Sequence, residues 1–187
     1  RLLDVLAQDY DVALMNPPYG SQNRMPDVVQ EYIEKRYEYS PEFYINFFEV
    51  CDRLSKSNGR IGMLIPRSFM FKRRFMEFRE DFVGPRGSFD FLTEFGMGIL
   101  DNATVRTAGT VVRTGGKQRP VADFIRLHDV GTEEKETEFL KSVLNSKQDV
   151  KRFFHIDLSE LSKIPRTPIC YSTPAEVREL HESQTKI

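Results

Sequence analysis

The chain has 187 residues, of which 40% are hydrophobic and 29% are charged, and its formal net charge is −1. This length suffices for one domain of ordinary size with its own core, and the chain lacks the strongly basic charge of many nucleic-acid binders. No apolar run approaches the roughly 20 residues that a membrane helix needs, so we expect no membrane contact and no secretory signal. The cysteines and histidines lie far apart in the sequence, which predicts reduced thiols in a cytoplasmic protein and no metal site.

The first third of the chain predicts alternating strands and helices. In chain order we expect a strand, a short helix, a longer helix and a second strand, at residues 10–15, 27–36, 41–57 and 61–65. The first strand stops at Asn16, because the two prolines that follow have no N–H for a ladder. The longer helix has Ser40 as its N-cap and is ended by Asn58, which precedes a glycine. The second strand is almost continuously apolar, as in a parallel strand covered on both faces.

The rest of the chain predicts a helix, three strands and an amphipathic helix, at residues 68–83, 89–95, 105–114, 121–128 and 132–146. A turn at Gly115 is expected to join the last two strands. Residues 149–171 look irregular, and a final helix opens at Thr173.

The order of these elements predicts an α/β fold with a mostly parallel sheet and helices on both faces. We expect a boundary near Val130. It would separate residues 1–130 from a mostly helical or irregular extension over residues 131–187.

The most informative stretch is Asn16-Pro17-Pro18-Tyr19-Gly20, which follows the first strand. In open α/β sheets, ligands bind at the carboxyl ends of the strands. The prolines stiffen the loop, so the Asn16 side chain and the Pro17 carbonyl offer two acceptor oxygens that suit an amino group such as that of adenine. Tyr19 can stack on a flat base. The alternative is a proline-rich turn in which Asn16 makes only local hydrogen bonds.

The tetrapeptide at residues 16–19 resembles the catalytic motif of Rossmann-like methyltransferases that act on amino groups. Residues 40–65 resemble the helix and strand that follow this motif in adenine-N6 DNA methyltransferases. Residues 66–71 look like the next turn of those enzymes, and residues 94–105 resemble a later motif that packs against the target base.

The likeness covers residues 5–128 and implies the later half of a class I methyltransferase sheet. A weaker likeness, over residues 154–171, is to large methyltransferases of the BREX/Pgl phage-defence type, which also resemble type II restriction-modification enzymes. The partners implied are double-stranded DNA and other restriction or phage-defence subunits.

The resemblance implies direct methyl transfer from S-adenosylmethionine to the N6 amino group of an adenine flipped out of the duplex. Asn16 and the Pro17 carbonyl would hold the amino group while Tyr19 stacks on the base, so catalysis would rest on orientation and electrostatics. A Phe often precedes the Asp-Ala-Thr-Val-like run of the later motif in this family. Leu100 stands there in this sequence, which makes Phe95 the alternative for the second face of the pocket.

The cofactor side of the site is the largest departure from the family. Such enzymes carry a Gly-rich loop after their first strand, and only 15 residues precede Asn16. We therefore expect the main cofactor site to lie before Arg1 and this chain alone to be inactive. Asn16 and Pro18 would touch the cofactor, and Tyr19 and Gly20 the base.

Two basic regions are candidates for contacts with the DNA backbone: a cluster of Lys72, Arg73 and Arg74, and Arg106 near a strand. The alternative is that both are solvated faces. An acidic run over residues 129–138 would face away from DNA.

Two other functions fit the same motif. A protein-glutamine or RNA methyltransferase would apply the same chemistry to another planar amino group. A non-catalytic half that grips DNA or scaffolds a partner would show steep salt dependence of binding without methylation.

Overall fold

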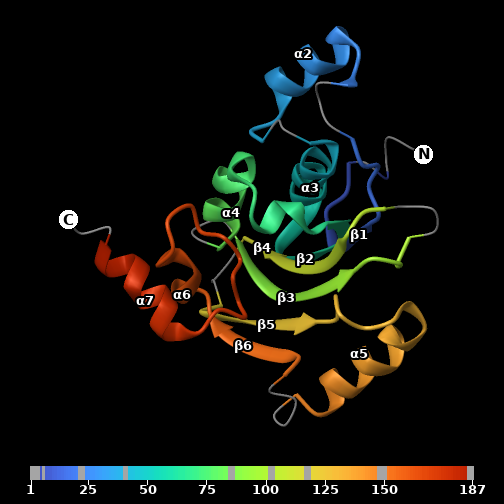
Figure 1. Ribbon diagram of the computed structural model, residues 1–187. Coiled ribbons are helices and arrows are strands. Elements are labelled where there is room, and N and C mark those ends of the chain that lie inside the picture. The colour runs from blue at the N-terminus through green and yellow to red at the C-terminus, as the bar shows by residue number, and fades with distance from the viewer. Residues whose placement is uncertain are drawn as a thin grey trace.

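A computed structural model describes residues 5, 7–20, 24–39, 42–83, 87–100, 104–115, 119–146 and 151–184. These residues build one six-stranded sheet flanked by helices (Figure 1). The strands are β1 (Tyr10–Met15), β2 (Ser55–Pro66), β3 (Gly87–Gly96), β4 (Thr107–Thr114), β5 (Val121–Arg126) and β6 (Phe153–Asp157). Their order across the sheet is β1-β2-β4-β3-β5-β6.

The sheet is mixed rather than mostly parallel, because two of its five neighbouring strand pairs are parallel and three are antiparallel. β1 pairs with β2 in parallel and β3 pairs with β5 in parallel. β4 lies antiparallel between β2 and β3, and β6 is antiparallel to β5. β1, β2, β3 and β5 therefore run in the same direction, so their carboxyl ends lie along one edge of the sheet. This is the edge at which ligands bind in sheets of this type.

The helices are α2 (Asp27–Arg36), α3 (Phe43–Arg53), α4 (Met76–Val83), α5 (Lys135–Leu144), α6 (Ser159–Ser162) and α7 (Ala175–Gln184), with 3-10 turns at Arg67–Met70, Arg73–Phe75 and Thr132–Glu134. α3 and α4 cover one face of the sheet and α5 lies on the other, while α2 projects away from the sheet (Figure 1). Within the described ranges, no helix is long and apolar enough to cross a membrane.

The main core lies between the sheet and the layer of α3 and α4. Alternate residues of β2 point into it, and Ile61, Met63 and Ile65 are all buried. Phe48 of α3 and Phe78 of α4 meet above them with ring centroids 5.1 Å apart. Burying a side chain of this size stabilises a fold by about 1.5–3 kcal/mol, so this aromatic layer holds the two helices on the sheet.

A smaller apolar cluster lies on the opposite face. Ile125 and Leu127 are fully buried there beside Phe91. Phe139 of α5 packs edge-on against Phe91, with ring centroids 6.0 Å apart. This cluster belongs to the β3–β5 side of the sheet, and α5 covers the second face there.

The predicted end of the longer helix is wrong. α3 ends at Arg53, and Ser55 already pairs with Tyr10 of β1. Asn58 has a positive φ of 65°, which is the conformation that its sequence signal favours. It lies inside β2, however, where the following Gly59 has no room for a side chain: a Cβ there would be 2.8 Å from the Lys56 carbonyl oxygen.

The helix predicted from Ser68 onward is broken into two 3-10 turns followed by α4. Phe75, Phe78 and Phe82 are buried as predicted, but Phe71 is 40% exposed. The Arg79 guanidinium accounts for the break, because it donates to the carbonyl oxygens of Phe69 and Lys72 and so takes acceptors that a continuous helix would use.

The C-terminal part is more regular than predicted, because β6 and α6 lie within residues 149–171. Leu161, Ile169 and Tyr171 are buried in the same core as β2 and α3. The expected boundary near Val130 therefore does not separate two cores among the described residues. The strands flanking Gly115 are not a hairpin either, since β3 lies between β4 and β5.

Candidate active site at the carboxyl end of β1

The predicted catalytic loop lies at the expected edge of the sheet. β1 ends at Met15, which pairs with Met63 of β2, and the loop follows at once. Asn16 and Pro18 are exposed, whereas Pro17 is buried. The buried proline fixes the loop, so that the Asn16 side chain stands in solvent at the end of a rigid strand.

The carboxyl-terminal end of the loop is held by two hydrogen bonds. The Tyr19 hydroxyl donates to the carbonyl oxygen of Leu64 in β2 (3.1 Å), and the Phe43 N–H of α3 donates to the Gly20 carbonyl (3.0 Å). The Tyr19 ring lies edge-on to Tyr44, with centroids 6.2 Å apart. Burial raises the pKa of Tyr19, so its hydroxyl remains a donor at neutral pH. The orientation of the predicted stacking residue is therefore fixed by β2.

Asn16 opens onto a groove of about 460 Å³ on the face of the sheet opposite α3. Phe95 of β3 lines the same groove, although 79 positions separate it from Asn16. Leu100 is half-buried in the turn after β3 and is not among the residues that line this groove. The structure thus brings Phe95, rather than Leu100, together with Asn16.

The described residues provide little for the cofactor. Gly96, Gly98 and Gly115 have positive φ angles of 76°, 81° and 54°. Gly96 packs on His128 and Gly98 on Thr132, and none of the three opens a helix. A Gly-rich loop of the kind that binds dinucleotides and S-adenosylmethionine requires that setting.

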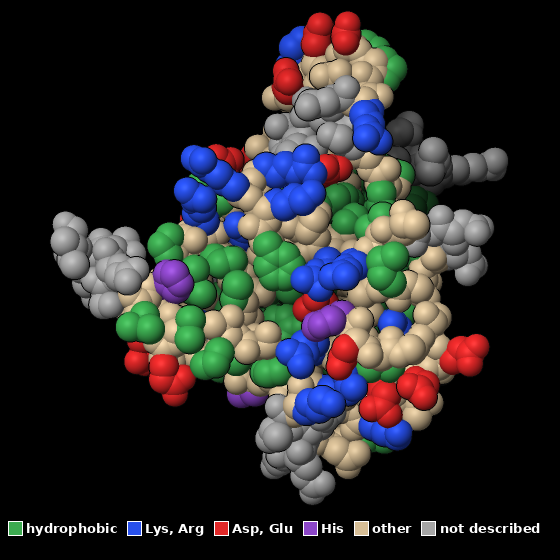
Figure 2. All heavy atoms as spheres, in the orientation of Figure 1, with side chains coloured by type: hydrophobic (Ala, Val, Ile, Leu, Met, Phe, Trp, Pro, Cys, Tyr) green, Lys and Arg blue, Asp and Glu red, His purple; other side chains and the backbone are tan. Residues whose placement is uncertain are grey.

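The candidate DNA-contacting residues differ in their surroundings. Arg74 is paired with Glu42 and stacks over Phe75, so its charge is already neutralised. Lys72, Arg73 and Arg106 are exposed. Lys and Arg side chains gather near α4, and acidic side chains gather over α5 (Figure 2). A cavity of about 610 Å³ beside α4 is lined by Arg73 and Arg74 and not by the catalytic loop.

Sequence reasoning missed a buried charged cluster at the same edge of the sheet. Glu94 of β3 is 4% exposed and pairs with Arg67, which follows β2. The Tyr171 hydroxyl donates to Glu94 at 2.6 Å, and the His128 Nδ1 lies 3.4 Å from it. The Arg67 guanidinium also lies over the Phe71 ring, at 4.9 Å. The only signal in the sequence was an acidic residue within an apolar strand.

Tyr171→Phe tests this cluster. Removing a hydrogen bond to a charged group is expected to lower the free energy of unfolding by about 2 kcal/mol. Burial, and then the Glu94 charge, raise the pKa of Tyr171, whereas the unfolded tyrosine titrates near pH 10. The folded state therefore holds more protons above pH 10, and stability falls as the pH rises. Between pH 9 and 11, urea denaturation should show the wild type losing about 1 kcal/mol more than the variant.

Comparison with known proteins shows which sequences this chain is similar to. Residues 4–87 match the family described as Eco57I restriction-modification methylase. The chain is 26% identical over 183 residues to the adenine-specific methyltransferase PglX of Lacticaseibacillus casei, covering 96% of this chain and 15% of PglX. It is 27% identical over 173 residues to the adenine-specific methyltransferase BrxX of Escherichia coli O9:H4, covering 89% of this chain and 14% of BrxX. The chain thus spans a small part of each curated relative.

Solved structures share the fold. A class I S-adenosylmethionine-dependent methyltransferase from Listeria monocytogenes matches with a TM-score of 0.58 and 16% identity, over 75% of this chain and 43% of that one. The methyltransferase subunit of a type I restriction-modification system from Streptococcus thermophilus matches with a TM-score of 0.63 and 14% identity, over 89% of this chain and 38% of that one. Residues 4–87 thus match the Eco57I restriction-modification methylase family, and most of the chain is similar in sequence to the adenine-specific methyltransferases PglX and BrxX.

Proposed function

We propose that this chain supplies the base-side part of the active site in an S-adenosylmethionine-dependent adenine-N6 DNA methyltransferase that serves restriction-modification or phage defence. The observation that carries the proposal is the Asn16–Tyr19 loop, which β2 and α3 hold at the carboxyl end of β1. The loop opens onto a groove that it shares with Phe95. The names of the relatives PglX and BrxX support the choice of adenine.

In this mechanism the target adenine leaves the duplex and enters the site at the loop. The Asn16 side-chain oxygen and the Pro17 carbonyl each accept a hydrogen bond from the exocyclic amino group. This draws the nitrogen toward tetrahedral geometry and makes its lone pair available. Tyr19 stacks on one face of the base, and Phe95 supplies the apolar wall opposite. S-adenosylmethionine, when bound, would supply the methyl group and leave as S-adenosylhomocysteine, while the methylated nitrogen would lose one proton to water.

We further propose that most of the cofactor site belongs to residues outside those described. None of the described glycines with positive φ begins a helix, so none of them forms a cofactor-binding loop. The Asn16–Pro18 loop would therefore be one part of a cofactor site that other residues complete. By itself this chain should therefore transfer no methyl groups. It needs the Gly-rich half of the fold to do so.

The experiment that tests this function is methyl transfer from labelled S-adenosylmethionine to unmethylated DNA. This chain is assayed beside the longest polypeptide that its reading frame encodes, and the product is digested to nucleosides. Label in N6-methyladenine from the longer polypeptide supports the proposal. Label in RNA or protein would move the assignment to an RNA or protein-glutamine methyltransferase. DNA binding with no transfer to any substrate would indicate a non-catalytic module.

The exposed basic residues predict how the chain holds double-stranded DNA. The logarithm of the binding constant falls linearly with the logarithm of the salt concentration. Each phosphate contact makes this fall steeper by about 0.9. In fluorescence anisotropy titrations, Arg73→Ala and Arg106→Ala should each make the fall shallower by about this amount. Lys35→Ala, on the projecting helix α2, is the control and should leave it unchanged. Equal slopes for all three variants would remove Arg73 and Arg106 from the DNA surface.

A further inference from the structure

One aromatic ring faces solvent at the carboxyl edge of the sheet. Phe71 is 40% exposed, and among the described residues it is the one phenylalanine whose side chain is exposed. It ends the 3-10 turn that follows β2, after Phe69 and Met70, which are fully buried. Single apolar residues are common on protein surfaces, so exposure alone assigns Phe71 no role. What sets the ring apart is the series of side chains that holds it.

This series of contacts runs from Phe71 into the core. The Arg67 guanidinium lies 4.9 Å from the centre of the Phe71 ring, and Arg67 is paired with Glu94 of β3. Glu94 is 4% exposed and accepts a hydrogen bond from the Tyr171 hydroxyl at 2.6 Å. A guanidinium is attracted to the face of an aromatic ring, so the ring is held in place although it faces solvent. A side chain that is already held loses little conformational freedom when it binds.

The turn that carries Phe71 adjoins the catalytic loop. The Tyr19 hydroxyl donates to the carbonyl oxygen of Leu64, seven residues before Phe71. The Tyr19 ring also packs edge-on against Tyr44, whose hydroxyl lies 3.5 Å from the Ser68 Oγ atom in this turn. Two sets of contacts thus join the turn to the residue proposed to stack on the target base. Phe71 does not line the groove proposed for that base, so its ring lies next to the groove and not inside it.

Exposed cations surround this ring. Lys72 and Arg73 follow it in the chain, and both are exposed. Arg106 is exposed as well, and its carbonyl oxygen accepts the Arg67 N–H at 2.9 Å, which places it at the start of the same turn. Basic side chains flank an apolar area on this side of the molecule (Figure 2). An apolar ring between exposed cations suits a surface that meets DNA, because the cations can hold phosphates while the ring stacks on bases.

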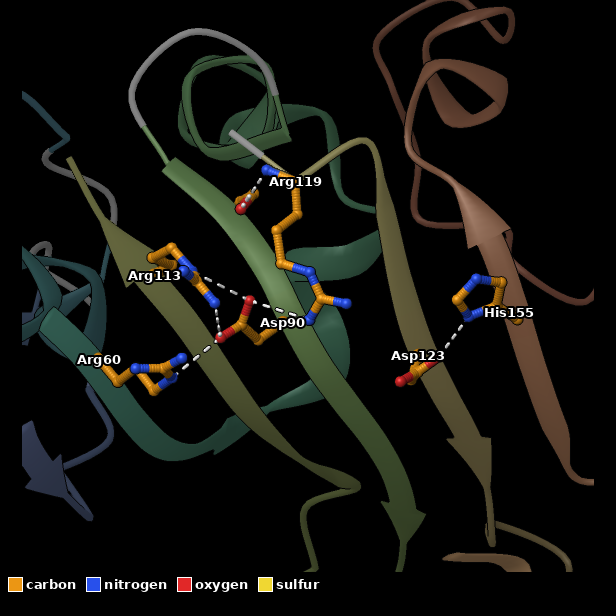
Figure 3. Close-up of polar contacts among 7 residues, drawn as sticks. Arg60, Asp90, Arg113, Arg119, Asp123 and His155 are labelled. Atoms are coloured by element: carbon orange, nitrogen blue, oxygen red, sulfur yellow. Dashed lines mark hydrogen bonds and ion pairs between the residues drawn. The ribbon is translucent and has the colours of Figure 1, made fainter. Parts of the chain in front are cut away.

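The arginines toward the amino ends of the parallel strands are arranged differently. Arg60, Arg113 and Arg119 converge on the carboxylate of Asp90, with nitrogen–oxygen distances of 3.0, 3.3 and 3.5 Å in that order (Figure 3). Arg113 pairs with Ser88 at the start of β3, so this cluster lies away from the carboxyl edge of the sheet. Arg119 is 42% exposed and therefore offers a matched control for an arginine at that edge.

We propose that Phe71 enters the DNA duplex at the target site and fills the space that the flipped adenine leaves, and that Arg67 positions the ring for this step. Taking a base out of the duplex costs the stacking and pairing of that base. A phenylalanine side chain can occupy the gap and stack on the neighbouring bases. The partner of this ring is therefore the base stack of double-stranded DNA. The inference rests on the proposed function, because it requires a flipped adenine.

Methyl transfer to two duplexes tests the role of Phe71. The adenine that is methylated by the longest polypeptide of this reading frame is located first. Its partner thymine is then replaced by a pyrene nucleotide, which fills the gap itself. On the ordinary duplex, single-turnover transfer by Phe71→Ala should be about tenfold slower than by the wild type, because the ring no longer offsets the lost stacking. On the pyrene duplex the two rates should agree within about twofold. Leu144→Ala, which removes an 81% exposed side chain from α5, should match the wild type on both duplexes.

Arg67→Gln tests the positioning of the ring. It should slow transfer to the ordinary duplex about threefold, recover on the pyrene duplex, and add nothing to the effect of Phe71→Ala, because residues that act through one group are not additive. Arg119→Gln, the control away from the carboxyl edge, should leave both rates unchanged. A loss from Arg67→Gln that is the same on both duplexes, or that adds in full to that of Phe71→Ala, would refute the positioning role.

The proposal for Phe71 fails if Phe71→Ala is as slow on the pyrene duplex as on the ordinary one, because the ring would then act in the chemistry or in the fold. Wild-type rates for Phe71→Ala on both duplexes would overturn it as well. In either case, transfer by the wild type to adenine would keep the proposed function. If the wild type transfers no methyl groups to DNA, the proposed function and this inference are both refuted.

Discussion

Replacing Asn16 by alanine is expected to lower kcat for methyl transfer about 10³-fold in a polypeptide that also contains the cofactor half. The side-chain oxygen of Asn16 accepts from an amino group whose hydrogens become more acidic as the nitrogen bonds to the methyl carbon. The contact is therefore stronger in the transition state than in the bound substrate, so its loss should appear in kcat rather than in KM. Single-turnover transfer of labelled methyl groups to duplex DNA measures it.

The matched control is Asn145→Ala. Asn145 follows α5, where its side chain is exposed and donates to the Lys141 carbonyl, and its loss should leave kcat unchanged. Circular dichroism spectra should be the same for both variants, because Asn16 is exposed and buries nothing on folding. A loss of less than about fivefold for Asn16→Ala would contradict the role of the loop. A rise in KM alone would make Asn16 a binding residue of the DNA rather than a group that acts on the amine.

The sequence predicted those parts of the site whose members are neighbours in the chain. The apolar run before Asn16 and the two prolines after it together define a strand and its end, and β1 ends at Met15. The run from Ile61 to Ile65 likewise lies within β2. In both places hydrophobic pattern and proline chemistry act over a few residues, so no tertiary information is needed.

The rest of the site depends on the order of the strands. Phe95 shares a groove with Asn16 although β2 and β4 lie between β1 and β3 in this sheet. Glu94 meets Tyr171 across 77 positions. Short-range patterns carry no information on such pairs, which form only when the whole sheet has assembled. The prediction that Asn58 ends a helix is wrong for the same reason. A residue with positive φ can end a helix or interrupt a strand, and here the pairing of β2 with β1 decides between the two.

Arg79 shows how far such long-range contacts reach. Its side chain is fully buried, and in the described part of the chain its hydrogen bonds go to backbone carbonyls rather than to a carboxylate. It donates to the carbonyl oxygens of Phe69 and Lys72, both at 2.8 Å, and to those of Arg166 and Thr167, at 2.7 and 2.9 Å. One guanidinium thereby joins the turn after β2 to the segment before α7. Nothing near Arg79 in the sequence signals that its side chain is buried.

Arg79→Met should lower the free energy of unfolding by about 3–5 kcal/mol, as measured by urea denaturation. Methionine fills much of the same volume, but it removes a donor from four backbone carbonyls. The Lys72 carbonyl keeps the Phe75 N–H as a donor, and each buried acceptor that is left unsatisfied costs about 1–3 kcal/mol when water cannot reach it. Arg73→Met is the control: Arg73 is exposed, and its loss should cost less than about 0.5 kcal/mol. If Arg79→Met were as stable as the control, water would be replacing the guanidinium, and the C-terminal segment would not depend on it. A large loss of stability that also lowers the protection of Ile169 and Tyr171 from hydrogen exchange would show that Arg79 holds the segment before α7 against the sheet. The Tyr171–Glu94 hydrogen bond at the carboxyl edge of the sheet would then depend on Arg79 as well.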